Sequence, residues 1–192
     1  MKTEEETYSE AQKFFKKIEK EESMSNSKGK ILRINCRWVM FDTSYLPFGA
    51  LRELDELLGP VSHTILYRIG EGCGRAIYDK YANLGFDRDS CLKFIAAAAW
   101  CFGWGLIDFE IKEDHGKARI YNSFEAESNI ANRGTNPENS CNFIKGAIAG
   151  VWDRYIGESW SITETKCRAR GDKHCEFVVK PGLKSQIKRS QK

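Results

Sequence analysis

The order of periodic segments in this chain of 192 residues predicts an α+β fold, in which an antiparallel sheet packs against helices. In some segments apolar residues recur every three or four positions, and in others they recur every second position. The two kinds of segment come in the order strand, three helices, hairpin, helix, hairpin. Because strands and helices do not alternate one by one, a doubly wound parallel sheet is disfavoured.

The N-terminal quarter contains a charged helix, a linker and a strand. Residues 3–22 carry an apolar stripe at helical spacing, formed by Tyr8, Ala11, Phe15 and Ile18. A free helix of this kind is marginal in water, so we expect the stripe to pack on its own domain or on a second subunit. Residues 23–29 are rich in Ser, Asn and Lys and are typical of a linker. Residues 32–40 alternate apolar and polar side chains, which predicts a strand.

Three predicted helices follow. The first begins at Pro47 and stops at Gly59-Pro60, the second covers about 61–81, and the third covers 90–102. The run Gly70-Glu71-Gly72-Cys73-Gly74 lies within the second helix. It lacks the spacing of a dinucleotide fingerprint and does not follow a strand, so it predicts close packing of another helix.

The C-terminal half is predicted to contain two hairpins separated by a helix. Residues 107–111 and 118–123 alternate around a turn at 114–117, and residues 127–140 are polar. A helix is predicted over 141–155, and two strands start at Trp160 and Cys175. The chain then divides into an N-terminal helix and linker (1–29), a body (30–180) and a basic, solvated tail (181–192).

Composition limits the class of protein. The formal net charge is only +3, which does not suggest direct binding of nucleic acid. No apolar run approaches the ~20 residues of a membrane span, and the first residues do not form a signal peptide, so we expect a soluble, cytoplasmic protein without a membrane span. Seven cysteines in a reducing compartment indicate metal-bound, buried or catalytic thiols more than disulfides.

A metal site is the first hypothesis for the last fifth of the chain, where Cys141, Glu164, Cys167 and Cys175 occur within thirty-five residues. Cys141 shares the apolar face of its helix, so its thiol points inward. A turn with Gly171 in a left-handed conformation would place Cys167 opposite Cys175. A one-residue β-bulge near Thr165-Lys166 would turn Glu164 to the same face as Cys167.

Zinc suits three thiolates and one carboxylate, and a site closed by four protein ligands is structural. From spacing alone, a disulfide between Cys167 and Cys175 and a set of simple buried thiols remain alternatives.

Four stretches resemble the vinyl-4-reductase (4VR) domain family. They are Asn122-Ser-Phe-Glu-Ala-Glu127, Cys141 with Gly146-Ala-Ile-Ala-Gly150, Glu164-Thr-Lys-Cys167 and Gly171-Asp-Lys-His-Cys175. The resemblance covers about residues 30–180. The family includes sensor domains of phenol- and xylene-responsive transcription activators, a protein of bacteriochlorophyll synthesis and stand-alone archaeal proteins.

The resemblance implies a ligand-binding fold of the nitric-oxide-signalling and vesicle-tethering type, an apolar pocket and a homodimer. In the phenol-sensing relatives, zinc is held by three Cys and one Glu, and the matching positions here are Cys141, Glu164, Cys167 and Cys175. The expected pocket lies between the third and fourth helices and the sheet, and its expected lining is Trp100, Trp104, Phe109, Ile120, Val151 and Ile162.

Two functions from different classes follow. The first is a module that binds or senses a small apolar, hydrocarbon-like or lipid-like molecule, with zinc as a structural cofactor and a separate protein as its output. The relatives present tryptophan and tyrosines where this chain has Ile120, Val151 and Ile162, so a phenol-like ligand is not expected. The alternative is a component of a reductase acting on a vinyl-bearing or other hydrophobic substrate, although the sequence has no nicotinamide, flavin or haem motif. A third reading is a pure interaction module.

Overall fold

The computed structural model describes residues 1–19, 25–27, 30–33, 36–38, 48–112, 115–138, 140–157 and 160–182. The helices are α1 (Glu4–Glu19), α2 (Phe48–Leu58), α3 (Val61–Asn83), α4 (Arg88–Cys101), α5 (Phe124–Arg133) and α6 (Asn142–Ile156). The strands are β1 (Ser25–Ser27), β2 (Lys30–Arg33), β3 (Cys36–Trp38), β4 (Leu106–Ile111), β5 (Gly116–Tyr121), β6 (Trp160–Lys166) and β7 (Cys175–Pro181).

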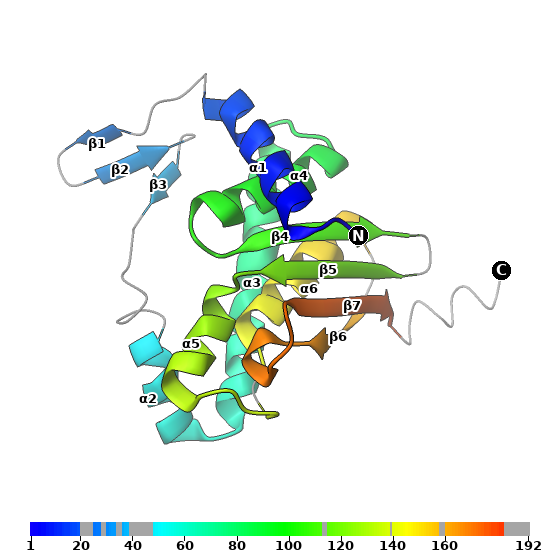
Figure 1. Ribbon diagram of the computed structural model, residues 1–192. Coiled ribbons are helices and arrows are strands. Elements are labelled where there is room, and N and C mark those ends of the chain that lie inside the picture. Colours follow the sequence, from blue (N-terminus) through cyan, green and yellow to red (C-terminus); the bar gives the residue numbers. More distant parts are fainter. Residues whose placement is uncertain are drawn as a thin grey trace.

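The main sheet has four antiparallel strands in the order β4-β5-β7-β6. Helices α3 and α6 lie behind it, α4 and α1 lie beside β4, and α5 and α2 lie at the opposite end (Figure 1). The predicted fold class, an α+β fold with an antiparallel sheet against helices, is therefore confirmed. The predicted tail, apart from its first two residues, lies outside the described residues.

The strand predicted over 32–40 is not a single strand. The structure contains β2 and β3, which pair antiparallel with Ile31 opposite Trp38, and β1 pairs with β2 within the stretch predicted as a linker. A period of two residues is the same in one long strand and in two short ones, so the sequence pattern could not separate the two cases. The side chains of these strands lie outside the described residues.

Helix α5 falls largely in the polar stretch for which no helix was predicted. Asn122 has φ +52° and turns the chain out of β5, and the side chain of Ser123 caps α5 by accepting the Ala126 amide at 3.3 Å. Gly134, at φ +67°, ends the helix after ten residues. The helix is short and mostly polar, so its apolar periodicity was too weak to predict it.

Helices α3 and α6 touch through glycine. A Cβ placed on Gly70 or Gly74 would overlap the backbone carbonyls of Phe143 and Ala147 on α6. Equally, a Cβ on Gly146 or Gly150 of α6 would overlap carbonyls of α3. The backbones therefore approach as closely as residues without side chains allow, and the predicted close helix packing at the Gly70–Gly74 run is confirmed.

The core has two parts. One lies between the sheet and α6 and includes the fully buried Ile120, Trp152 and Phe177. The other lies between α3 and α4 and includes Tyr81 and Phe94, whose ring centroids are 4.0 Å apart. Val151 of α6 belongs to the second part while its neighbour Trp152 belongs to the first, so α6 joins the two.

Helix α1 packs on α4 and β4 of its own chain. Tyr8 makes an edge contact with Trp100, at 5.7 Å between centroids, and Phe14 makes one with Phe94, at 6.3 Å. Ala11 is 7% exposed. The predicted packing of this stripe on its own domain is thus confirmed for Ala11 and Tyr8, whereas the side chains of Phe15 and Ile18 lie outside the described residues.

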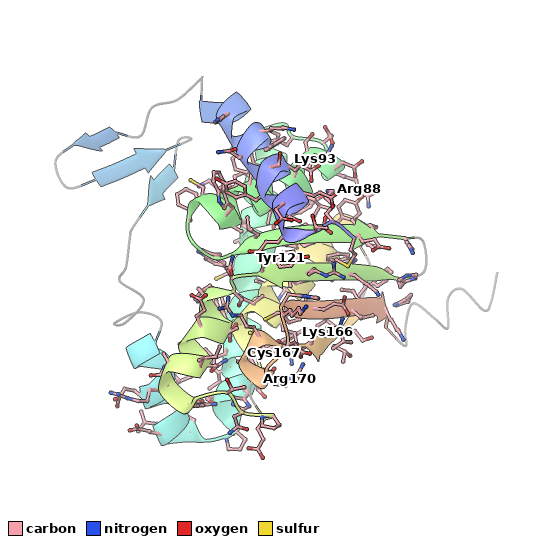
Figure 2. The ribbon with its side chains drawn as sticks, in the orientation of Figure 1. Arg88, Lys93, Tyr121, Lys166, Cys167 and Arg170 are labelled. Atoms are coloured by element: carbon pink, nitrogen blue, oxygen red, sulfur yellow. The ribbon has the colours of Figure 1, made fainter. Side chains whose placement is uncertain are left out.

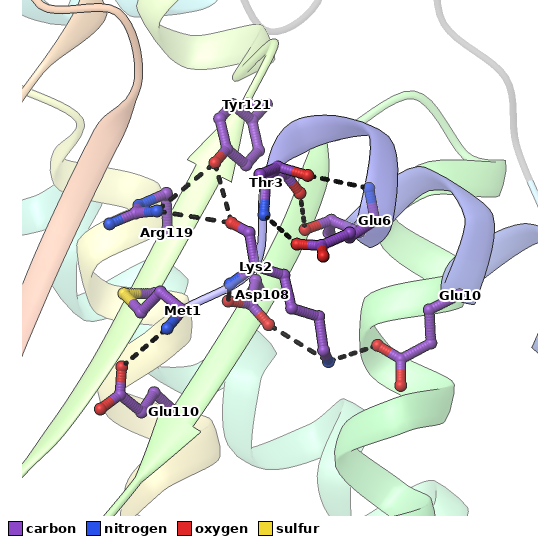
Figure 3. Close-up of polar contacts among 10 residues, drawn as sticks. Met1, Lys2, Thr3, Glu6, Glu10, Asp108, Glu110, Arg119 and Tyr121 are labelled. Atoms are coloured by element: carbon purple, nitrogen blue, oxygen red, sulfur yellow. Dashed lines mark hydrogen bonds and ion pairs between the residues drawn. The ribbon is translucent and has the colours of Figure 1, made fainter.

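The residues before α1 are fixed to β4 by polar contacts (Figure 3). The backbone N–H of Lys2 donates to the buried Asp108 carboxylate at 2.9 Å, and the Lys2 ammonium lies 3.4 Å from the same carboxylate. The Met1 amine lies 3.5 Å from Glu110. These contacts place the start of α1 beside the first strand of the main sheet.

A pair of glycine substitutions in α3 tests the close packing. Gly74→Ala should lower the free energy of unfolding by about 1–3 kcal/mol, because the new methyl group overlaps the α6 backbone. Gly72→Ala should raise it by about 0.5–1 kcal/mol, because the methyl group meets open space and alanine favours a helix. Urea unfolding measures both, and equal effects would contradict the packing described.

Candidate metal centre and apolar cavity

Four side chains converge at the end of the sheet nearest α5. Cys141 is the N-cap residue of α6, Glu164 lies on β6, Cys167 follows β6, and Cys175 opens β7. One possible ligand atom from each residue lies within 4.8 Å of the others, and the three cysteines are fully buried. Figure 2 shows Cys167 at this end of the sheet. The four residues selected by sequence spacing are therefore together in space.

The backbone between β6 and β7 creates this arrangement. The strand register shifts between Glu164 and Lys166, which is the predicted bulge. After Cys167 the chain makes one 3₁₀ turn, over Arg168–Arg170, and Gly171 ends the turn with φ +102°. The Asp172 carboxylate accepts the Cys167 N–H at 2.8 Å, and the Arg168 N–H donates to the Cys175 sulfur at 3.4 Å. The turn thus fixes both thiols.

The two oxygens of Glu164 have different surroundings. Oε2 accepts the hydroxyl of Ser140 at 2.7 Å and the N–H of Cys141 at 3.1 Å. Oε1 is buried and has no hydrogen-bond partner among the described residues. Burial, and then the nearby Cys167, raise the pKa of Glu164 to about 7. A buried carboxylate oxygen without a partner is costly, and a cation would satisfy it.

The sulfur positions fit a tetrahedral thiolate site. The Cys141 sulfur lies 3.7 Å from that of Cys167 and 3.9 Å from that of Cys175. A tetrahedron with zinc–sulfur bonds of about 2.3 Å has sulfur–sulfur edges of about 3.8 Å. All three cysteines are free thiols in the structure, so the alternative of a Cys167–Cys175 disulfide is not what it contains. The donor set and its spacing fit zinc, which would be structural because protein ligands occupy all four positions.

Protons on the three sulfurs are shared within the cluster. Hydrogen bonding with Cys167 and Cys175 raises the pKa of the Cys141 thiol, and hydrogen bonding from Cys141 and Cys167 lowers the pKa of the Cys175 thiol well below its usual value. One sulfur is therefore already disposed to be a thiolate. A metal requires the others to lose their protons too, so its binding would release protons.

Glu125 is a buried acid beside this cluster that the spacing argument did not select. It lies on α5 and is 2% exposed. Its two oxygens accept the N–H groups of Phe143 and Ile144, at 2.9 Å and 2.8 Å, in the first turn of α6. Burial raises its pKa to about 8, while these two amides act in the opposite direction. Glu125 fixes the start of α6, and with it Cys141.

An apolar cavity of about 340 Å³ lies between α3, α4, α6 and the inner face of the sheet. Of the residues expected from sequence, Trp104, Phe109, Ile120 and Val151 line it. Trp100 instead contacts Tyr8 of α1, and Ile162 packs against the core between the sheet and α6. The structure thus brings four of the six residues together around one space.

Small residues create much of this cavity. Ala98 and Ala99 of α4, Gly74 of α3 and Ala147 of α6 all line it, together with Tyr81. The run Ala96–Ala99 was visible in the sequence, but a run of alanines does not say which neighbour it faces. The apolar pattern around Cys73 favours a packing role, yet this residue is exposed at the rim of the cavity.

The fold and the two sites define a class, an α+β ligand-binding domain with a buried apolar cavity and a cluster of three Cys and one Glu that could hold a metal. Residues 119–181 match the model of the vinyl-4-reductase (4VR) domain. This match contains all four residues of the cluster. The resemblance to the vinyl-4-reductase domain family that the motifs indicated is therefore confirmed.

Two relatives match in sequence. An uncharacterized protein of Methanocaldococcus jannaschii is 31% identical over 116 residues, which are 60% of this chain and 63% of that protein. The phenol regulator MopR of Acinetobacter guillouiae is 26% identical over 155 residues, which are 76% of this chain and 28% of that protein. This chain thus spans less than two thirds of the length of either relative.

Solved structures show the same fold. The phenol-responsive sensory domain of the transcription activator PoxR, solved with phenol, has a TM-score of 0.75 at 18% identity, covering 93% of this chain and 95% of that one. A vinyl-4-reductase family protein of Methanocaldococcus jannaschii has a TM-score of 0.54 at 22% identity, covering 76% and 84%.

The fold also extends to the two distant groups expected from the sequence. A trafficking protein particle complex subunit 3 of Naegleria fowleri, at 17% identity and covering 73% of this chain and 93% of that one, has a TM-score of 0.52. An H-NOX protein of S. oneidensis, at 11% identity and covering 89% of each chain, has the same TM-score of 0.52. Within the described part of the chain, no helix is long and apolar enough to cross a bilayer.

The metal hypothesis predicts about one zinc ion per chain by elemental analysis of the purified protein. Cys167→Ser should lose this zinc and lower the melting temperature, because metal-binding free energy is also folding free energy. Cys101→Ser, outside the cluster, should keep the zinc and change the melting temperature less. Equal melting temperatures and zinc contents in the two variants would contradict the site.

A second pair of variants tests the role of Glu125. Glu125→Ala should lower the free energy of unfolding by about 2–3 kcal/mol, because two buried N–H groups at the start of α6 lose their charged acceptor. Glu127→Ala removes an exposed carboxylate 3.3 Å from Arg168 and should cost no more than about 1 kcal/mol. Denaturant unfolding with parallel zinc analysis measures both; similar costs would argue against Glu125 as a support for α6.

Proposed function

We propose that this protein is a small-molecule-binding or sensing domain for an apolar ligand, with a structural zinc site. The apolar cavity carries the proposal. Its volume, about 340 Å³, is at the lower end of the range of ligand sites, which are usually mostly apolar. Similarity to MopR, which is named a phenol regulator, supports a sensing role.

The ligand class follows from the lining. Among the described lining residues, only Cys73, Lys80 and Tyr81 carry titratable side chains, and Cys73 and Lys80 are exposed at the surface. The interior is formed by aliphatic and aromatic groups such as Ile95, Ile120 and Val151. A hydrocarbon-like or lipid-like molecule would fit this interior better than a small polar ligand, because a buried polar group needs a partner.

Zinc would serve this function as a scaffold. Cys141 and Val151 belong to one helix, α6, and its first residue binds the metal while its last turns line the cavity. A metal at the start of α6 would hold the cavity wall in place without contacting the ligand. We further propose that the protein acts in the cytoplasm as a homodimer, and that a separate protein carries any output signal.

Filling the cavity tests the proposal. The neutral probe N-phenyl-1-naphthylamine should bind the unmodified protein, and Val151→Trp should weaken this binding at least tenfold while zinc content stays unchanged. Ile69→Trp adds the same side chain to an exposed position of α3 outside the lining and should bind normally. Ala98→Leu, a smaller change to the lining, serves if Val151→Trp fails to fold. Normal probe binding by every folded cavity variant would overturn the proposal.

A further inference from the structure

A second cavity, of about 650 Å³, lies where α1 crosses α4 and β4. Its walls come from three elements that are distant in sequence. Ala11 and Phe14 of α1 face Leu92 and Ala96 of α4 across it, and Ile111 of β4 contributes to its base. The space is thus bounded by apolar groups of the body and closed on one side by the N-terminal helix.

The second cavity shares a wall with the first. Ile107 and Phe109 of β4 line both spaces. Both side chains are only partly buried, which agrees with free space on either side of them. A rotation of these two side chains would join the apolar cavity to the space beneath α1.

The charges around the second cavity are not all paired. The Lys2 ammonium contacts the carboxylates of Glu10 and Asp108 (Figure 3), and the Asp89 carboxylate accepts the Tyr155 hydroxyl at 2.7 Å. Two further lysines, Lys13 of α1 and Lys93 of α4, also line the cavity.

Neither Lys13 nor Lys93 has an ion-pair partner within the described part of the chain, and both are exposed. Figure 2 shows Lys93 on α4, beside α1. An apolar space bordered by two unpaired ammonium groups suits a molecule with an apolar body and an anionic end. The same two lysines would then be bridged by that end, which would tie α1 to α4.

We propose that the second cavity binds the anionic head group of an acyl-chain amphiphile between Lys13 and Lys93, and that the chain passes Ile107 and Phe109 into the first cavity. This inference rests on the proposed function of the first cavity and specifies its ligand class, a carboxylate with a linear apolar chain. It also gives α1 a role in binding, because α1 supplies Lys13 and one wall of the site.

The test compares dodecanoate with dodecanol by calorimetric titration of the full zinc-bound chain. Dodecanoate should bind about tenfold more tightly than dodecanol, since two exposed ion pairs contribute about that much together. Lys13→Gln/Lys93→Gln should remove the difference and leave dodecanol binding unchanged. The matched control Lys16→Gln/Lys180→Gln changes two exposed lysines that line neither cavity and should behave as the unmodified protein.

The remaining outcomes separate the two proposals. Unchanged dodecanoate binding in Lys13→Gln/Lys93→Gln, with dodecanol binding abolished by Val151→Trp, would overturn the head-group site and leave the proposed function standing. Loss of dodecanoate preference in Lys80→Gln alone would place the head group at the opposite mouth of the first cavity and also overturn the inference. Dodecanoate and dodecanol affinities that both survive Val151→Trp would overturn the chain path and the proposed function together.

Discussion

The backbone contact between α3 and α6 is the constraint on which the rest of the structure depends. Four glycines, Gly70, Gly74, Gly146 and Gly150, let each helix place its carbonyl groups where the other would otherwise carry side chains. Such close approach adds dispersion contacts along both helices and brings Cα–H groups near carbonyl oxygens. With α6 held this closely against α3, its outer side is left to form the core with the sheet.

Helix α6 links both candidate sites. Its N-cap residue, Cys141, enters the metal cluster, and Glu125 of α5 satisfies the amides of its first turn. Further along, Ile144, Ile148 and Val151 border the apolar cavity. A displacement of α6 along its axis would alter the thiolate geometry and the cavity wall together, but the interlocked glycines oppose such a displacement. The sites are therefore mechanically coupled through one rigid element.

The sequence predicted the metal cluster better than the cavity, and the physical reason is locality. Cys167 and Cys175 are joined by a short turn, and the parity of Glu164 required a bulge that the structure contains, so local rules placed three ligands. The cavity depends on how helices pack. Trp100 was expected in the lining but faces α1, and the alanines of α4 define the space only because α3 and the sheet stand at a particular distance.

The errors in secondary structure have related causes. Helix α5 was not predicted because its stability comes from tertiary contacts and from the Ser123 cap rather than from an apolar stripe. Glu125 was visible only as part of a motif, because nothing in the sequence shows that a glutamate on one helix will accept amides at the start of another. The single strand predicted over 32–40 failed because two short paired strands produce the same alternation.

The place of β4 at the edge of the main sheet gives α1 a protective role as well. An edge strand presents unpaired backbone groups that can add a strand from another molecule. Here the residues before α1 run beside β4, where the Lys2 amide is bound to Asp108, and α1 then crosses between β4 and α4. Detachment of α1 would uncover this edge and invite edge-to-edge association of sheets, so anything that ties α1 to the body also guards the protein against aggregation.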